Sequence, residues 1–225
     1  MYTVYNQEFD MPITKTSLAE QARNELLESI VSGKLAAGSR LTEESLSREY
    51  GISRTPVRDA LSRLENDGLI ERLPSRGYQV KKLDPAAVDE LLVCRCEVEL
   101  MIFEKDHENI SLAALKELYD ELTALDIAKP DALAETRRID DALHSVINDA
   151  CSNRYWREFH NRLLKQRLPY RDVRNNGTAE LTLQLKEERL KLLSAILSGD
   201  KKQGREALLS HLENGRKDFI KIFNK

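Results

Sequence analysis

The glycines of this chain divide it into two unequal parts. Five of the nine glycines lie in the first 82 residues, and the other 143 residues hold only four. Because glycine marks turns and helix ends, the first part is predicted to consist of short elements. After Asp84-Pro85 the apolar residues recur at spacings of three and four, which is typical of long helices. We therefore expect two domains, residues 1–83 and 84–225, each large enough to bury a core.

The N-terminal part carries the start and stop signals of three helices followed by a hairpin. Helices are predicted over about residues 17–32, from Thr42 through Tyr50, and from Ser53 to Gly68. Their ends are marked by helix-capping residues and by glycine stops, namely Ser17, Thr42, Ser53, Gly33, Gly51 and Gly68. Two strands, 69–73 and 78–82, then flank the turn Pro74-Ser75-Arg76-Gly77. The pattern predicts a winged helix-turn-helix.

The third helix begins with hydrogen-bond donors suited to DNA. Arg54 and Arg58 are four residues apart, so they share one helix face, where each can hold a phosphate or a guanine. Ser53, Thr55 and the N–H groups of the helix end suit a phosphate. Residues 52–82 carry seven basic and four acidic side chains, whereas the whole chain has a net charge of −3. A solvated charged helix is the alternative, but it leaves the basic wing unexplained. We expect this face to bind double-stranded DNA.

The C-terminal part is predicted to be an all-α bundle, so the fold class is mainly α with one small β-hairpin. A helix opens at Asp84-Pro85, and five more are expected at 111–126, 131–150, 153–170, 178–198 and 201–223. Polar residues interrupt the apolar stripes of these helices at Arg95, Glu99, Asp140, His144, Arg189 and His211. Because unpaired buried charges are costly, these residues indicate one shared internal polar site, the alternative being local pairs such as Arg95–Glu99. His107 and His160 are expected to be surface or satisfied histidines.

Several motifs in the N-terminal part occur together. They are Gly33 to Leu41, Thr42 to Ser47, Gly51 to Leu61, Leu64, Gly68-Leu69 and Arg76-Gly77. This pattern, over about residues 15–82, resembles the winged helix of GntR-family bacterial transcription regulators. The resemblance implies that Arg54, Thr55 and Arg58 read operator DNA, and that Arg76 and Gly77 in the wing approach the minor groove. Some relatives carry a further DNA-contacting arginine where this chain has Glu44, so that contact is expected to be absent.

A second set of motifs lies in the C-terminal part: Arg95 to Glu99, Asp140 followed by His144, Asn153, Ala195-Ile196, Gly199-Asp200 and His211. It resembles the FCD effector domain of the FadR subfamily, which also implies dimerisation. Many such domains bind a divalent metal through one Asp and three His, and the metal holds a carboxylate effector. Asp140, His144 and His211 match three ligands, but the fourth position is Arg189, which cannot ligate a metal and does grip carboxylates. This leaves a weakened three-ligand zinc or nickel site, a metal-free pocket in which Arg189 holds the effector, or an empty structural network.

Composition and motifs together favour a cytoplasmic, homodimeric regulator whose operator binding responds to a small organic acid and which requires no cofactor. No stretch approaches the roughly 20 apolar residues of a membrane helix, and the first 25 residues lack a secretory pattern. The three cysteines do not suggest a disulfide framework. A metal-dependent hydrolase using Asp140, His144 and His211 is one alternative, but it lacks an H-E-x-x-H motif. A non-specific DNA architectural protein is another, and it would not need a bundle with a polar interior.

Overall fold

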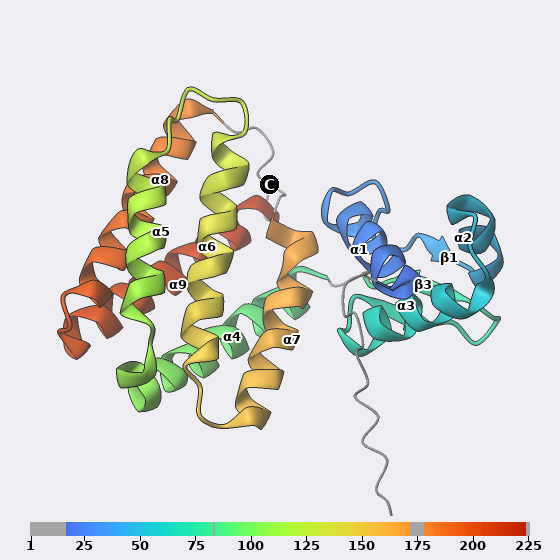
Figure 1. Ribbon diagram of the computed structural model, residues 1–225, viewed down its shortest axis with the longest axis horizontal. Helices are drawn as coiled ribbons and strands as arrows, with labels where there is room; N and C mark the ends of the chain where they lie inside the picture. The colour runs from blue at the N-terminus through green and yellow to red at the C-terminus, as the bar shows by residue number, and fades with distance from the viewer. Residues whose placement is uncertain (1–16, 83, 172–177, 224–225) are drawn as a thin grey trace, which may run out of the picture.

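The computed structural model describes residues 17–82, 84–171 and 178–223. Over these residues the chain forms a small winged helix and a larger helical bundle that lie side by side (Figure 1). Each has its own hydrophobic cluster. The predicted fold class, mainly α with a small sheet, is confirmed.

The winged helix contains the three predicted helices. They are α1 (Leu18–Val31), α2 (Glu43–Tyr50) and α3 (Arg54–Asn66). The side chains of Ser17 and Thr42 cap α1 and α2 as expected, and Gly51 ends α2 in the left-handed conformation with φ 64°. Ser53 stands at the N-cap of α3, but its side chain makes no capping hydrogen bond, so the predicted cap is wrong in that respect.

The sheet has three strands where the sequence predicted two. They are β1 (Arg40–Leu41), β2 (Ile70–Arg72) and β3 (Tyr78–Val80), all antiparallel in the order β1-β3-β2. A two-residue strand is too short to show an alternating pattern, which is why β1 was missed. Gly77 has φ 94°, and a Cβ there would lie 2.7 Å from the carbonyl oxygen of Leu41. Glycine at this position therefore allows the wing to close against β1.

The bundle consists of the six predicted helices, with a short 3-10 turn, η1 (His107–Asn109), after the first. They are α4 (Pro85–Asp106), α5 (Leu112–Ala124), α6 (Ala132–Asp149), α7 (Arg154–Arg171), α8 (Ala179–Leu197) and α9 (Lys201–Phe223). Asp84 caps α4 and Pro85 occupies its first turn, where the missing N–H costs nothing. Residue 83 lies outside the described residues. Apolar side chains such as Phe103, Leu143 and Leu192 form the core.

The described residues bear on two features considered from the sequence, membrane-spanning helices and the state of the cysteines. None of their helices is long and apolar enough to cross a membrane. Cys94, Cys96 and Cys151 are free thiols.

Helix α7 is where the bundle meets the winged helix, because it packs beside α1 (Figure 1). Asp67, directly after α3, accepts hydrogen bonds from Arg23 of α1 at 2.8 Å and from Lys165 of α7 at 2.7 Å. The side chain of Gln166 donates to the carbonyl of Asp67 at 3.3 Å and lies where a side chain at Gly68 would otherwise be. The end of α3 is thus held jointly by α1 and α7.

Candidate functional site

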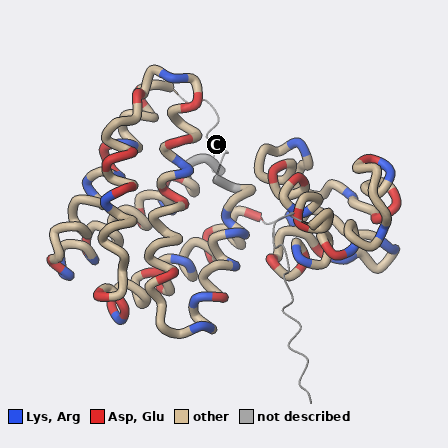
Figure 2. The backbone as a smooth tube through the Cα atoms, viewed as in Figure 1, with Lys and Arg blue, Asp and Glu red and all other residues tan. Residues whose placement is uncertain are grey.

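The N-terminus of α3 presents the predicted DNA-contacting residues to solvent. Ser53, Arg54, Thr55 and Arg58 are all exposed. Both oxygens of the Glu43 carboxylate accept hydrogen bonds from Arg58, at 2.8 Å each, so the guanidinium is held in an oriented fork. Along the chain of the winged helix, acidic and basic residues are interspersed (Figure 2).

The wing places further arginines beside α3. Arg76 has φ 67°, which is rare for a residue with a side chain, and its carbonyl accepts a hydrogen bond from Arg40 at 3.0 Å. A groove between α3 and the wing is lined by Arg40, Arg54, Arg58, Arg72, Arg76 and Gly77. Glu44, where some relatives carry arginine, also lines it and lies 3.8 Å from Arg54. Four of the six residues predicted to meet DNA, Arg54, Arg58, Arg76 and Gly77, therefore line one groove, whereas Ser53 and Thr55 are exposed on α3 and its N-cap but do not line it.

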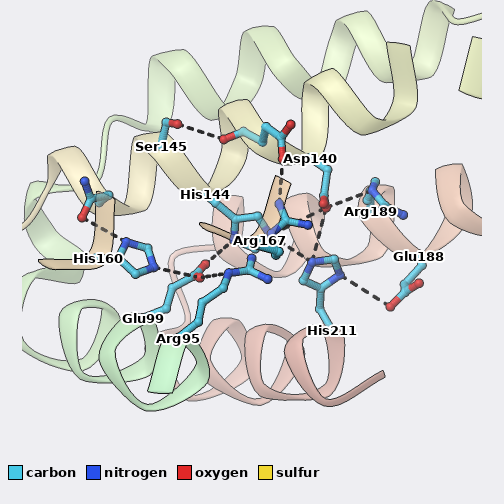
Figure 3. A network of polar contacts seen from close by, with 12 residues as sticks. Arg95, Glu99, Asp140, His144, Ser145, His160, Arg167, Glu188, Arg189 and His211 are labelled. Atoms are coloured by element: carbon cyan, nitrogen blue, oxygen red, sulfur yellow. Dashed lines mark hydrogen bonds and ion pairs between the residues drawn. The ribbon is translucent and has the colours of Figure 1, made fainter. Parts of the chain in front are cut away.

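The six polar residues predicted inside the bundle also converge, from α4, α6, α8 and α9 (Figure 3). All of them are buried, and their exposed fractions do not exceed 8%. They are Arg95, Glu99, Asp140, His144, Arg189 and His211. The interpretation as one shared site describes this arrangement better than isolated local pairs, because the contacts run between helices.

Glu99 of α4 is the first centre of this network. One carboxylate oxygen contacts Nδ1 of His144, and the other lies 3.2 Å from Nε2 of His160. That second oxygen also lies 3.4 Å from Nε of Arg95. His160 is completely buried and its other ring nitrogen contacts Asn148 at 3.0 Å. It is a satisfied histidine, as one of the two expectations allowed, and it belongs to the network.

Asp140 of α6 is the second centre. Its Oδ1 atom lies 2.9 Å from Nε of Arg189, 3.3 Å from Nε2 of His211 and 3.7 Å from Nε2 of His144. The other ring nitrogen of His211 lies 3.5 Å from a carboxylate oxygen of Glu188. The two centres are joined where the Nε2 atoms of His144 and His211 approach to 3.2 Å.

Burial and neighbouring charges set the protonation of the two histidines. Burial, followed by the charge of Arg95, lowers the pKa of His144 to about 4, so this ring is neutral near pH 7. It then donates its Nδ1–H to Glu99 and keeps a lone pair on Nε2. Burial alone would lower the pKa of His211 as well, but hydrogen bonds with Asp140 and Glu188 outweigh it and raise the pKa. Asp140 and Glu188 therefore face the two ring nitrogens of His211 and stabilise the positive charge of the protonated ring.

The two central carboxylates are held in the charged form. Burial by itself would raise the pKa of Asp140, but the charge of Arg189 and the hydrogen bond from His211 hold it well below its usual value. Burial would likewise raise the pKa of Glu99, yet His144, Arg95 and the hydrogen bonds from two imidazoles hold it well below. Each carboxylate is thus stabilised by a guanidinium as well as by imidazole groups.

A cavity of about 130 Å³ adjoins the Asp140 centre. Since one water needs roughly 10–15 Å³ on this measure, the cavity has room for a small molecule. Five arginines line it, against three acidic residues. Five charged lining residues were not predicted from the sequence, namely Arg216, Asp218, Arg137, Arg167 and Glu188, and the last three had a detectable signal. Their signal was helical register: Arg137 precedes Asp140 by one turn, Arg167 follows His160 by seven residues, and Glu188 is next to Arg189.

The donor set for a metal is incomplete. Asp140, His144 and His211 offer ligand atoms within 4.8 Å of one another, and this is a ligand set that a metal accepts. However, Oδ1 of Asp140 already faces the guanidinium of Arg189 at 2.9 Å. Because Arg189 supplies a positive charge at the fourth ligand position and cannot be deprotonated, these residues do not fit a four-ligand metal centre.

Both parts of the chain match known families. Residues 18–80 match the model of bacterial regulatory proteins of the gntR family, and residues 90–214 match the model of the FCD domain. The chain is 31% identical over 140 residues to the uncharacterized HTH-type transcriptional regulator YdhC of Bacillus subtilis (strain 168), with 60% of this chain and 61% of YdhC covered. It is 35% identical over 109 residues to the HTH-type transcriptional regulator McbR of Escherichia coli (strain K12), with 47% of this chain and 49% of McbR covered. These matches therefore span about half to three fifths of the two relatives.

Solved structures show the same fold. E. coli McbR/YncC superposes with a TM-score of 0.75 at 25% identity, over 92% of this chain and 99% of that one. A transcriptional regulator of the GntR type from Rhodococcus sp. RHA1 gives a TM-score of 0.73 at 20% identity, over 90% and 97% of the two chains. The fold and the polar cavity thus define a class, winged-helix proteins with a helical effector domain.

The chain belongs to the GntR family of bacterial regulatory proteins and carries an FCD domain. Members of this family are transcription regulators that bind operator DNA and effector ligands, and they are not enzymes. The hydrolase alternative for Asp140, His144 and His211 is therefore set aside.

Proposed function

We propose that this protein is a cytoplasmic regulator whose operator affinity is controlled by a small organic acid bound in the bundle cavity. The observation that carries the proposal is the arginine-rich lining of a cavity inside a bundle attached to a winged helix. Guanidinium groups favour carboxylates because they offer two parallel donors. A cavity of about 130 Å³ suits a small acid rather than a long acyl chain. In this proposal Arg54, Thr55 and Arg58, with the Arg76-Gly77 wing, contact the operator.

Helix α7 supplies a route between the cavity and the DNA face. Arg167 lines the cavity and donates to Asp141 at 2.7 Å. The two preceding residues, Lys165 and Gln166, bind Asp67 immediately after α3. A shift of α7 caused by an occupant of the cavity would therefore be felt at the end of the recognition helix. The proposed coupling therefore runs through contacts made by consecutive residues of one helix.

The experiment is an operator selection followed by a binding titration. A site is selected from random duplex DNA, and its affinity for the protein is measured by fluorescence anisotropy with and without acetate, succinate and citrate. We expect at least one acid to change the affinity, and Lys165→Gln to reduce that change while the acid still binds. An absence of sequence preference, or an affinity that no bound acid alters, would contradict the proposal.

We further propose a homodimer, because one winged helix reads only a few base pairs and two-fold pairing doubles the site. Tyr155, Trp156 and Phe159 form an exposed aromatic group on α7, and the rings of Trp156 and Phe159 lie 6.1 Å apart. Such groups mark protein interfaces. Sedimentation velocity should show a dimer that Trp156→Glu weakens, whereas Leu112→Glu on the exposed face of α5 should not. A wild-type monomer at micromolar concentration, with and without DNA, would remove the idea.

The metal question can be tested at Arg189. We expect wild-type protein purified without chelator to carry no stoichiometric zinc or nickel, because Arg189 supplies the cation that Asp140 needs. Arg189→His should recruit a divalent metal, since it adds an imidazole to Asp140, His144 and His211. Arg189→Ala is the control, because it removes the cation without adding a ligand. Elemental analysis decides: stoichiometric metal in the wild type, lost on Asp140→Ala, would show that three ligands suffice.

A further inference from the structure

The five arginines around the cavity differ in how far their donors are already used. Arg216 binds both oxygens of Asp89 through Nε and Nη2, so its charge is balanced at the rim. Arg189 donates from Nη1 to the carbonyl of Leu185 at 2.9 Å, and its Nε faces Asp140. Arg137 also has a partner. These three arginines are therefore engaged with the protein itself.

The buried Nε of Arg189 makes no hydrogen bond either, but it lies 2.9 Å from Oδ1 of Asp140 as an ion pair. Arg95 and Arg167 also keep buried donors without a hydrogen-bond acceptor, and Arg95 approaches the nearest oxygen of Glu99 only to 3.4 Å. Nε and Nη2 of Arg95 have no hydrogen-bond partner among the described residues, although the side chain is almost completely buried. The nearby carboxylate of Glu99 is already shared with His144 and His160. Arg167 uses Nη2 for Asp141, but its buried Nε also lacks a partner. A buried donor left unpaired lowers the free energy of unfolding, so an acceptor that binds these nitrogens would be stabilising.

The two guanidinium groups also act on each other. Both line the cavity, and both side chains reach the middle of the network (Figure 3). Burial, followed by the positive charge of Arg167, lowers the pKa of Arg95, in keeping with the position of both side chains on one cavity. An anion between them would remove the repulsion and satisfy the open donors at once.

We propose that Arg95 and Arg167 together form an oxyanion subsite that holds the carboxylate or phosphate group of the effector, while Arg189 serves as the internal counter-ion of Asp140. This inference rests on the proposed function, and it reassigns the gripping arginine. The carboxylate of the ligand replaces no protein hydrogen bond, because the atoms that receive it, Nε and Nη2 of Arg95 and Nε of Arg167, make none among the described residues. A planar two-donor fork on each side favours oxyanions over a spherical anion such as chloride.

The test measures anion binding to the full-length protein by isothermal titration calorimetry. Acetate and succinate probe the carboxylate source, inorganic phosphate probes the phosphate source, and chloride at equal ionic strength is the negative control. At least one oxyanion should bind the wild type, and Arg167→Gln should weaken that binding about ten- to a hundredfold, the value of one or two charge-assisted hydrogen bonds. This variant should fold, because the Asp141 it leaves is 30% exposed and stays solvated.

Arg216→Gln is the matched control. It removes an arginine from the same cavity, but one whose donors are used by Asp89, so anion affinity should change little. Arg167→Lys should bind more weakly than the wild type and better than Arg167→Gln, since it keeps the charge and loses the fork. Equal losses in Arg167→Gln and Arg216→Gln would overturn the subsite, because they would indicate only a diffuse positive field.

One further variant separates failure of the subsite from failure of the proposed function. Gly215 is exposed and lines the cavity, and a Cβ there meets no atom within 4 Å, so Gly215→Leu adds bulk to the cavity lining without displacing an arginine. We expect it to block the oxyanion. If Gly215→Leu blocks binding but Arg167→Gln does not, the cavity function stands and the subsite is wrong. If no oxyanion binds the wild type, the subsite is overturned, and the operator titration decides the proposed function independently.

Discussion

Replacing Glu99 with alanine is expected to destabilise the helical bundle by about 3–5 kcal/mol, the usual cost of breaking a buried charged pair by removing one partner. The Glu99 carboxylate is fully buried and is shared by Arg95, His144 and His160. Its removal leaves a buried guanidinium without a counter-ion and two imidazoles without their acceptor. The melting temperature should fall on the order of 10 °C in differential scanning calorimetry.

Glu97→Ala is the matched control, because Glu97 lies on the same helix and is exposed. Its effect should stay within about 0.5 kcal/mol. The pKa of Glu99 is lower when folded than when unfolded, so its contribution is present above its unfolded pKa and is lost as pH falls through its folded pKa. The stability difference between wild type and Glu99→Ala should therefore shrink in acid. A loss no larger than that of Glu97→Ala would show that the network does not hold the bundle together.

The helices of this protein could be placed from sequence because their ends carry local signals. Asp84-Pro85 begins α4 and Gly51 ends α2, and each acts through its own backbone or its nearest neighbours. The missing strand β1 is different, since its two residues become a strand only by pairing with Gln79 and Tyr78 nearly 40 residues later. The hydroxyl of Ser53 has the right position for a cap, but the side-chain geometry that makes a cap is not written in the sequence.

The polar site could be predicted as a set of residues, but its pairing could not. Helical register shows that Glu99 faces the core, and it suggests a local partner at Arg95. Three-dimensional packing adds His144 and His160, which lie 45 and 61 residues away in the chain. One of the three alternatives left open by the sequence has Arg189 gripping the effector, and the 2.9 Å distance from its Nε to Asp140 favours a counter-ion role. Helical register predicts which face of a helix a residue lies on. Which side chains it contacts depends on how the helices pack against one another, and that cannot be read from register.

The largest functional effect is expected from Arg58→Ala, which should weaken operator binding about ten- to a hundredfold and relax the preference at one base position. Arg58 is exposed on the DNA face, and Glu43 fixes the plane of its guanidinium. Glu43 takes Nε–H and one Nη2–H, so the remaining edge, formed by Nη1 and the second Nη2–H, is the one suited to bidentate contact with guanine, and its loss removes base readout. Anisotropy titrations against the selected operator and against single-base variants measure affinity and preference together.

Salt dependence decides whether Arg58 reads a base or only a phosphate. Loss of a phosphate contact lowers the slope of log affinity against log salt by about 1 and weakens all sequences alike, whereas loss of a base contact leaves the slope nearly unchanged. Arg63→Ala is the control on the same helix, because Arg63 is held by Glu20 at 2.7 Å and should affect neither preference nor slope. If Arg58→Ala keeps wild-type affinity and preference at physiological salt, the recognition-helix assignment is wrong. If only the salt slope changes, Arg58 contacts a DNA phosphate and does not read a base. Base readout must then come from other residues of the groove. Arg54 is the first of these to test, because it lies on the exposed face of the same helix.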